Sequence, residues 1–112
     1  MTRAKFIALT GTGGGTFQTM DGYKQSLSYY GYVVWFGIAK PNAKTWYTYE
    51  LTTGLPCCCG STRINALDAT RRRMREIVQL LQLGDTNPES TMAKARARLI
   101  AYQKQTAEDA LT

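Results

Sequence analysis

The first half of the chain is marked by strand-like runs of aromatic and β-branched residues. Two of these runs, residues 29–40 and 45–52, are separated by the turn-like spacer Pro-Asn-Ala-Lys at 41–44. We therefore expect a central β-hairpin over residues 29–52. With a four-residue loop, Trp35 and Trp46 share one face, and the core-facing pairs on the other are Ile38 with Tyr47, Phe36 with Tyr49 and Val34 with Leu51.

Weaker signals place further strands on both sides of this hairpin. Residues 5–9 form an apolar run that ends at the glycine-rich segment 11–15, the pattern of a strand followed by a flexible loop. Asp21-Gly22 is a turn signal that predicts a short strand on either side of it. Residues 55–59 predict an edge strand, because Pro56 cannot donate a ladder hydrogen bond. We expect an antiparallel sheet of three to five strands.

The second half of the chain has the apolar spacing of helices. Across residues 62–83 the apolar side chains recur every three or four positions, which predicts an amphipathic helix. Ser61 or Thr62 is suited to accept hydrogen bonds from its first free N–H groups, and Gly84 is suited to end it.

A second helix is expected over residues 88–110, with Asn87 as its cap and Pro88 in its first turn. Its apolar face is thin, so we expect it either to pack beside the first helix or to reach away toward a partner, including a second copy of the chain. Its main apolar residues are Met92, Ala95, Leu99, Ala110 and Leu111.

These elements predict a single α+β domain over residues 1–112, mainly β in residues 1–60 and helical in residues 61–112. An antiparallel sheet packs against the two C-terminal helices. The predicted core comes from the hairpin and the first helix: Val34, Phe36, Ile38, Tyr47, Tyr49, Leu51, Leu67, Met74, Val78 and Leu81.

Composition supports a small globular domain and narrows its chemistry. The chain has 112 residues, of which 44% are hydrophobic and 20% charged, an ordinary balance for a single domain with a core. No apolar stretch is long enough to cross a membrane and no signal segment is evident, so we expect a cytoplasmic protein. The net charge of +6 favours polyanionic or acidic partners.

Catalysis is not expected. The chain has no histidine, which removes histidine-based acid–base catalysis and most zinc sites. Its eight acidic residues are scattered, and none forms an evident pair in the sequence. We therefore predict that the protein is not an enzyme.

Neither the glycine-rich segment nor the cysteines predict a cofactor. Residues 11–15 lack the lysine of a phosphate-binding loop, and Phe17 follows where a helix should begin. Cys57, Cys58 and Cys59 have no second cysteine pair with which to enclose a metal ion. They are interpreted as small side chains of a strand in a reduced protein.

Basic residues on the helices are the main candidates for contact with a polyanion. Lys94 and Arg98 lie four residues apart, with no acidic residue between them at helical spacing. Arg71 and Arg75 share one flank of the first helix and are the second choice. Arg72 points outward, and we expect Asp68 and Glu76, each four residues away, to offset its charge.

The two tryptophans allow two interpretations. If exposed, Trp35 and Trp46 would form a platform on which unpaired bases stack. If both faces of the sheet are covered, they are buried as a second small core, and we favour burial because exposed tryptophan is uncommon in monomers.

Residues 46–74 resemble an arrangement found in small bacterial and phage-borne domains: an aromatic strand, a Thr-Gly turn, a short strand, and a Gly-Ser-Thr junction at 60–62 that leads into a helix. HicB-type antitoxins have a similar junction. HicB proteins commonly carry an acidic residue in the first helical turn, where Arg63-Ile64-Asn65 stands here, and a separate DNA-binding segment that residues 88–112 do not match. The resemblance implies an origin in a phage or other mobile element and assigns no functional residue.

Two functional hypotheses follow. The first is a small basic protein that binds nucleic acid through Lys94, Arg98, Arg71, Arg72 and Arg75, with or without Trp35 and Trp46. The second is a protein-binding inhibitor of a nucleic-acid-processing complex, as small anti-CRISPR proteins are. The positive net charge excludes an acidic mimic of DNA.

Overall fold

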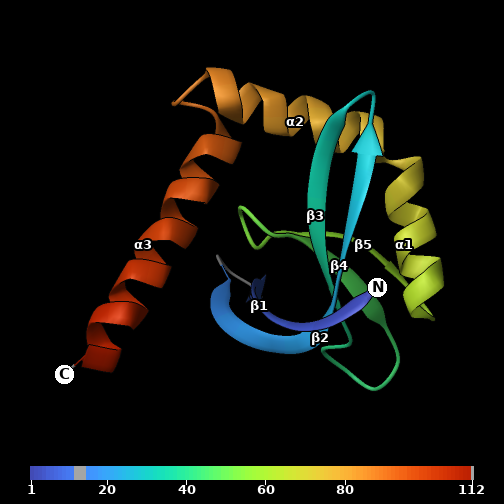
Figure 1. Cartoon of the computed structure of the whole chain (residues 1–112), viewed down its shortest axis with the longest axis horizontal. Coiled ribbons are helices and arrows are strands. Elements are labelled where there is room, and N and C mark those ends of the chain that lie inside the picture. The colour runs from blue at the N-terminus through green and yellow to red at the C-terminus, as the bar shows by residue number, and fades with distance from the viewer. Residues whose placement is uncertain (12–14, 112) are drawn as a thin grey trace.

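The chain folds as a five-stranded antiparallel sheet followed by three helices within residues 1–11 and 15–111, which the computed structural model describes. The strands follow one another in the sheet in chain order (Figure 1). They are β1 (Thr2–Thr10), β2 (Thr16–Tyr29), β3 (Tyr32–Ala39), β4 (Trp46–Glu50) and β5 (Pro56–Gly60). The helices are α1 (Arg63–Arg72), α2 (Met74–Thr86) and α3 (Thr91–Leu111). The expected α+β fold is confirmed.

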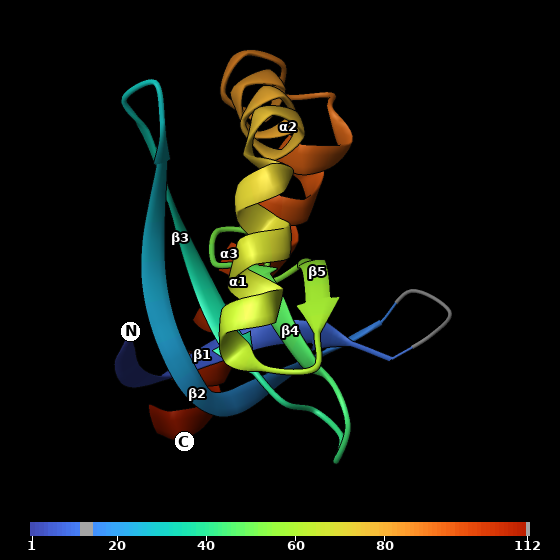
Figure 2. The same cartoon turned by 90° about the vertical axis from the view of Figure 1, so that its right-hand side faces the viewer.

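β2 is one long strand, so the predicted turn at Asp21-Gly22 is wrong. The strand pairs with β1 up to Lys24 and with β3 from Tyr23 onward, so the change of partner falls beside Gly22. A Cβ at Gly22 would lie only 2.1 Å from the carbonyl oxygen of Ile38. The absence of a side chain therefore lets the backbones approach where β2 curves away with β1 (Figures 1 and 2).

The sheet buries apolar residues on both faces. On the helix side, the cluster consists of Leu27, Val34, Phe36, Ile38, Leu67, Met74, Val78 and Leu81. On the other side, β1 and the first part of β2 fold back, and the cluster consists of Phe6, Ala8, Met20, Ala39 and Tyr49, with Tyr47 and Leu51 partly buried against it. The ring of Phe6 lies directly over Gly37, where a Cβ would be 2.5 Å from it. All ten predicted core residues are thus packed, but in two cores rather than one.

The register between β3 and β4 differs by one residue from the prediction. The observed pairs are Phe36 with Glu50, Gly37 with Tyr49, Ile38 with Thr48 and Ala39 with Tyr47. The connection spans residues 40–45, where the side chain of Asn42 accepts hydrogen bonds from the backbone N–H groups of Lys44 and Thr45. A shift of one residue exchanges the two faces of a strand. The even-numbered residues of β4 consequently face the helices.

The predicted helix over residues 62–83 is divided at Arg73. Its start is confirmed, because the Thr62 side chain accepts a hydrogen bond of 3.0 Å from the backbone N–H of Asn65. Near the break, the hydroxyl of Thr70 donates to the carbonyl oxygen of Ala66 at 2.9 Å. This side-chain bond competes with the helical backbone and bends helices, which accounts for the change of direction before α2.

Gly84 does not end α2, and Asn87 does not cap α3, so both predictions are wrong. α2 continues to Thr86. A Cβ at Gly84 would lie 3.1 Å from the Cβ of Met92, so this glycine instead allows close packing of α3. α3 begins at Thr91 rather than at residue 88, and the Ser90 hydroxyl accepts a hydrogen bond from the N–H of Ala93.

The first half of α3 is fastened to α2 and to the sheet. The guanidinium of Arg96 donates to the carboxylate of Asp85, to the carbonyl oxygen of Leu81 and to the hydroxyl of Thr52. The rings of Phe17 and Tyr102 lie 5.0 Å apart between centroids. Beyond Tyr102 the helix is exposed as far as residue 110 and extends away from the sheet (Figure 1).

Candidate functional site

Two aromatic rings and three cations meet where β2 changes partners. The guanidinium carbon of Arg63 lies 4.1 Å from the ring centroid of Tyr23 and 5.8 Å from that of Trp46. The two rings are 6.4 Å apart. Arg3 approaches the ring of Tyr23 to 5.8 Å, and the ammonium of Lys40 approaches that of Trp46 to 5.8 Å. We call these five residues the basic aromatic cluster.

The local fold explains why these residues meet. Trp46 is the first residue of β4 and pairs with Gly60, the last residue of β5. A Cβ at Gly60 would lie 2.6 Å from the backbone nitrogen of Ala66, so only glycine lets α1 start this close to the strand. The Thr62 cap then places Arg63 in the first turn of α1, beside the indole ring.

The cluster is strongly electropositive. Within the described part of the chain, Arg3, Lys40 and Arg63 form no ion pair with a carboxylate. The first turn of α1 contains no acidic residue, so the positive end of the helix dipole adds to the same field. Cation–π contact holds Arg63 without neutralising it. The arrangement can therefore bind an anion with planar, preorganised donors.

The two tryptophans lie on opposite faces of the sheet, contrary to the prediction. Trp46 faces α1 and is partly buried in the basic aromatic cluster. Trp35 pairs with Ser26 on the face away from the helices and is 53% exposed, so its expected burial is also wrong. The one-residue shift of β4 separates them.

The arginines at the break between α1 and α2 pair differently from the prediction. Asp68 binds Arg71 at 3.2 Å and Glu76 binds Arg73 at 3.4 Å, so neither carboxylate offsets Arg72. The divided helix disturbs the spacing of four residues between Arg72 and Glu76. Arg72 and Arg75 are exposed and form no ion pair within the described residues.

Lys94 and Arg98 are not an isolated basic pair. The ammonium of Lys94 lies 3.8 Å from the carboxylate of Glu89, which the later start of α3 leaves in the preceding turn. The guanidinium of Arg98 lies 5.9 Å from the ring centroid of Phe17. α1 and α3 lie at opposite ends of the molecule with the strands between them, so these two residues are separate from Arg63 (Figure 1).

The three cysteines are free thiols on β5, of which Cys57 and Cys58 are partly buried and Cys59 is exposed. Burial raises the pKa of the Cys57 thiol to about 12, and the nearby Glu50 carboxylate acts in the same direction. The described residues contain no group of three or more candidate ligands suited to hold a metal ion. Residues 12–14 of the predicted glycine-rich loop lie outside the described residues.

Sequence reasoning found Trp46 but missed its partners. Tyr23 follows the false turn signal at Asp21-Gly22, and Arg3 pairs with Tyr23 only through the β1–β2 register. The available signal was Arg63 itself, the basic residue placed directly after a helix cap. None of the helices in the described part of the chain is long and apolar enough to cross a membrane.

Comparison with known proteins adds no relative: no family model, curated protein or solved structure matches the chain. The resemblance of residues 46–74 to HicB-type antitoxins therefore stays a prediction. Any functional assignment must rest on the basic aromatic cluster and on the rest of the surface.

Proposed function

We propose that the protein is a small non-enzymatic protein that binds nucleic acid through the basic aromatic cluster. The observation that carries this proposal is Arg63, held 4.1 Å from the Tyr23 ring centroid with no carboxylate partner in the described residues. Arginine on an aromatic surface keeps its N–H groups available for phosphate oxygens.

The flanking cations extend this contact. Arg3 and Lys40 are exposed and approach the two rings of the cluster from β1 and from the β3–β4 connection. Several cations around one arginine suit a chain of phosphates better than a single anion, because each neutralised phosphate releases counterions. The net charge of +6 also attracts a polyanion over longer distances.

The test is the salt dependence of binding to duplex and single-stranded oligonucleotides, starting near 50 mM salt, where phosphate contacts are strongest. Arg63→Gln should weaken binding and reduce the slope of log affinity against log salt by about 0.9 on duplex DNA if one phosphate contact is lost. Lys104→Gln, on the exposed part of α3, removes the same charge and is the matched control. The absence of salt-dependent binding, or equal effects of both variants, would refute the proposal.

A second candidate is a protein-binding inhibitor of a nucleic-acid-processing complex, and a different surface favours it. Val33 and Trp35 are 55% and 53% exposed on the sheet face away from the helices. Tyr30, in the turn between β2 and β3, is 93% exposed. Tryptophan and tyrosine are enriched at protein interfaces. Recovery of one specific protein from nuclease-treated lysate, lost with Trp35→Ala but retained with Arg63→Gln, would favour this function over direct nucleic-acid binding.

A further inference from the structure

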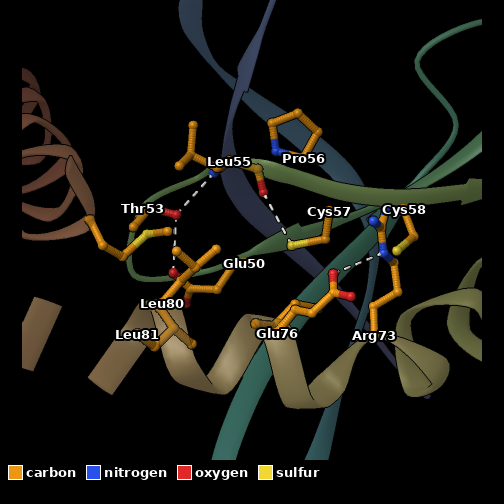
Figure 3. A pocket seen from close by; sticks show the side chains of 12 residues that line it. Glu50, Thr53, Leu55, Pro56, Cys57, Cys58, Arg73, Glu76, Leu80 and Leu81 are labelled. Atoms are coloured by element: carbon orange, nitrogen blue, oxygen red, sulfur yellow. Dashed lines mark hydrogen bonds and ion pairs between the residues drawn. The ribbon is translucent and has the colours of Figure 1, made fainter. Parts of the chain in front are cut away.

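A cavity of about 310 Å³ separates the β4–β5 turn and β5 from α2, away from the basic aromatic cluster. Figure 3 shows Leu80 and Leu81 of α2 on one side and Cys57 of β5 on another. The volume is at the lower end of the range for small-molecule sites, about 300–1,000 Å³. Most of its wall is apolar, with contributions from Leu55, Ile77, Leu80, Leu81 and Met92.

Glu50 is the exceptional residue in this wall. Its side chain is 4% exposed, and its carboxylate accepts hydrogen bonds from the N–H of Thr52 at 2.7 Å, the hydroxyl of Thr52 at 2.6 Å and the hydroxyl of Thr53 at 3.0 Å. The Thr53 hydroxyl in turn accepts from the N–H of Leu55, so its own proton points to Glu50. Acceptance of three donated bonds is the pattern of an ionised carboxylate.

No cation contacts this carboxylate directly in the described part of the chain, and the guanidinium of Arg96 reaches it only through the Thr52 hydroxyl, to which it donates at 3.4 Å. Glu50 forms no ion pair there, and the guanidinium of Arg73, which also lines the cavity, binds Glu76 at 3.4 Å. The thiol of Cys57 donates a hydrogen bond of 3.7 Å to the carbonyl oxygen of Leu55, and its raised pKa keeps the thiol neutral. The cavity thus combines apolar walls with one buried carboxylate that has no direct ion pair in the described part of the chain.

We propose that this cavity binds a small organic monocation, with a compact apolar body and an amine or amidine group that pairs with Glu50. The apolar body would replace water along Leu80, Leu81 and Met92, as burial of apolar surface requires. The cationic group would supply the counterion that a buried carboxylate needs. A neutral ligand of the same shape gains only the first contribution, and an anionic ligand is repelled.

The test is an NMR titration of the full chain with benzylamine, its neutral analogue benzyl alcohol, and benzoate. Benzylamine should bind more tightly than benzyl alcohol by about tenfold or more, because only the amine is positively charged and can form a charge-assisted hydrogen bond with the Glu50 carboxylate. Shifts should fall on residues that line the cavity, and benzoate should not bind. Equal binding of amine and alcohol, or no amine binding at about 5 mM, would overturn the proposal.

Two variants locate the charge that selects the ligand. Glu50→Gln should abolish the preference for benzylamine while retaining the affinity for benzyl alcohol, whereas Glu89→Gln, at an exposed ion pair outside the cavity lining, should retain the preference. If Glu50→Gln does not fold, Leu80→Trp provides the second test, because filling the cavity from its half-exposed edge should weaken both ligands. A Leu80→Trp variant that binds both ligands as the parent does would contradict the site.

Discussion

The hydroxyl oxygens of Thr48 and Thr70 lie 2.7 Å apart, and both side chains are completely buried. This hydrogen bond joins β4 to α1 in the middle of the helix-covered face of the sheet. Thr48 also accepts a bond of 3.2 Å from the backbone N–H of Cys58 on β5, and Thr70 donates to Ala66. A polar group in this position is tolerated because every hydroxyl has a partner.

Thr70→Val should lower the free energy of unfolding by about 1–3 kcal/mol, because the hydroxyl of Thr48 loses its buried partner. The Thr48→Val variant should also be destabilised, because the N–H of Cys58 loses its acceptor. The double variant should lose less than the sum of the two single losses, since the pair is one coupled unit. Urea denaturation of all three variants measures this coupling, and strictly additive losses would show that the bond contributes nothing.

Phe36→Ala and Leu67→Ala should each cost about 2–5 kcal/mol of stability, because both side chains are buried in the helix-side core. Val33→Ala is the matched control on β3, where the side chain is 55% exposed and little should change. The denaturation midpoints of the three variants decide the matter. An unchanged midpoint for Phe36→Ala or Leu67→Ala would contradict this packing.

Gly22→Ala should be strongly destabilising, since the new Cβ would meet the carbonyl oxygen of Ile38 at 2.1 Å. A backbone atom cannot move aside as a flexible side chain does, so β2 would have to separate from β3 or lose its bend. We expect a loss above about 2 kcal/mol, in the range of steric clashes at special backbone positions. Ser28→Ala, an exposed change on the same strand, is the comparison, and similar thermal midpoints for both variants would disprove the role of Gly22.

Gly22 also marks where the sequence pattern fails to predict the fold. A turn signal and a close backbone contact both use glycine, and only the partner strand distinguishes them. The helix-side core was predictable because Val34, Phe36 and Ile38 alternate within one strand and Leu67, Met74 and Val78 recur at helical spacing. The second core was not, because it depends on β1 folding back to place Phe6 over Gly37.

The basic aromatic cluster could likewise be predicted only in part from the sequence. Trp46 was noted because of its residue type, but its face depended on the β3–β4 register. Seven residues lie between the paired positions Ala39 and Tyr47, rather than the four of the expected loop, and this odd number shifts β4 by one position. Tyr23 and Arg3 are separated by twenty residues of sequence and meet only through strand pairing. Contacts of this kind arise from topology, which local patterns do not encode.

Asp85 should make stability sensitive to acid. Hydrogen bonds from Tyr32 and then from Arg96 hold the pKa of its carboxyl below the ordinary value. A carboxyl with a lowered folded-state pKa stabilises the fold above its unfolded pKa, near 3.9, and this contribution is lost as pH falls through the folded-state value.

Asp85→Asn should therefore reduce stability at neutral pH and remove part of the loss seen on acidification. Denaturation between about pH 6 and pH 2 brackets the titration of a carboxyl group. Asp21→Asn, which breaks an exposed contact of 4.0 Å to Lys5, is the control and should change little. Parallel pH profiles for the parent chain and Asp85→Asn would contradict the role of the Asp85–Arg96 contact.

The three cysteines of β5 should react with alkylating agents at different rates, with the exposed Cys59 first and Cys57, which is partly buried and has a raised pKa, last. The thiolate is the reacting form, and a pKa of about 12 leaves Cys57 almost entirely protonated near pH 8. Variants that retain a single cysteine allow each rate to be measured with iodoacetamide. Cys57 should react at least about tenfold more slowly than Cys59, because access and thiolate fraction act in the same direction.

Addition of denaturant below the unfolding transition distinguishes the two causes of slow reaction at Cys57. Local opening of β5 from the helix-side core would expose the thiol and bring its pKa toward the ordinary value, so its rate should rise while that of the already exposed Cys59 stays nearly constant. Equal rates for Cys57 and Cys59 without denaturant would instead mean that β5 does not stay packed against the helix-side core, and the cavity beside Glu50 would then lose one of its walls.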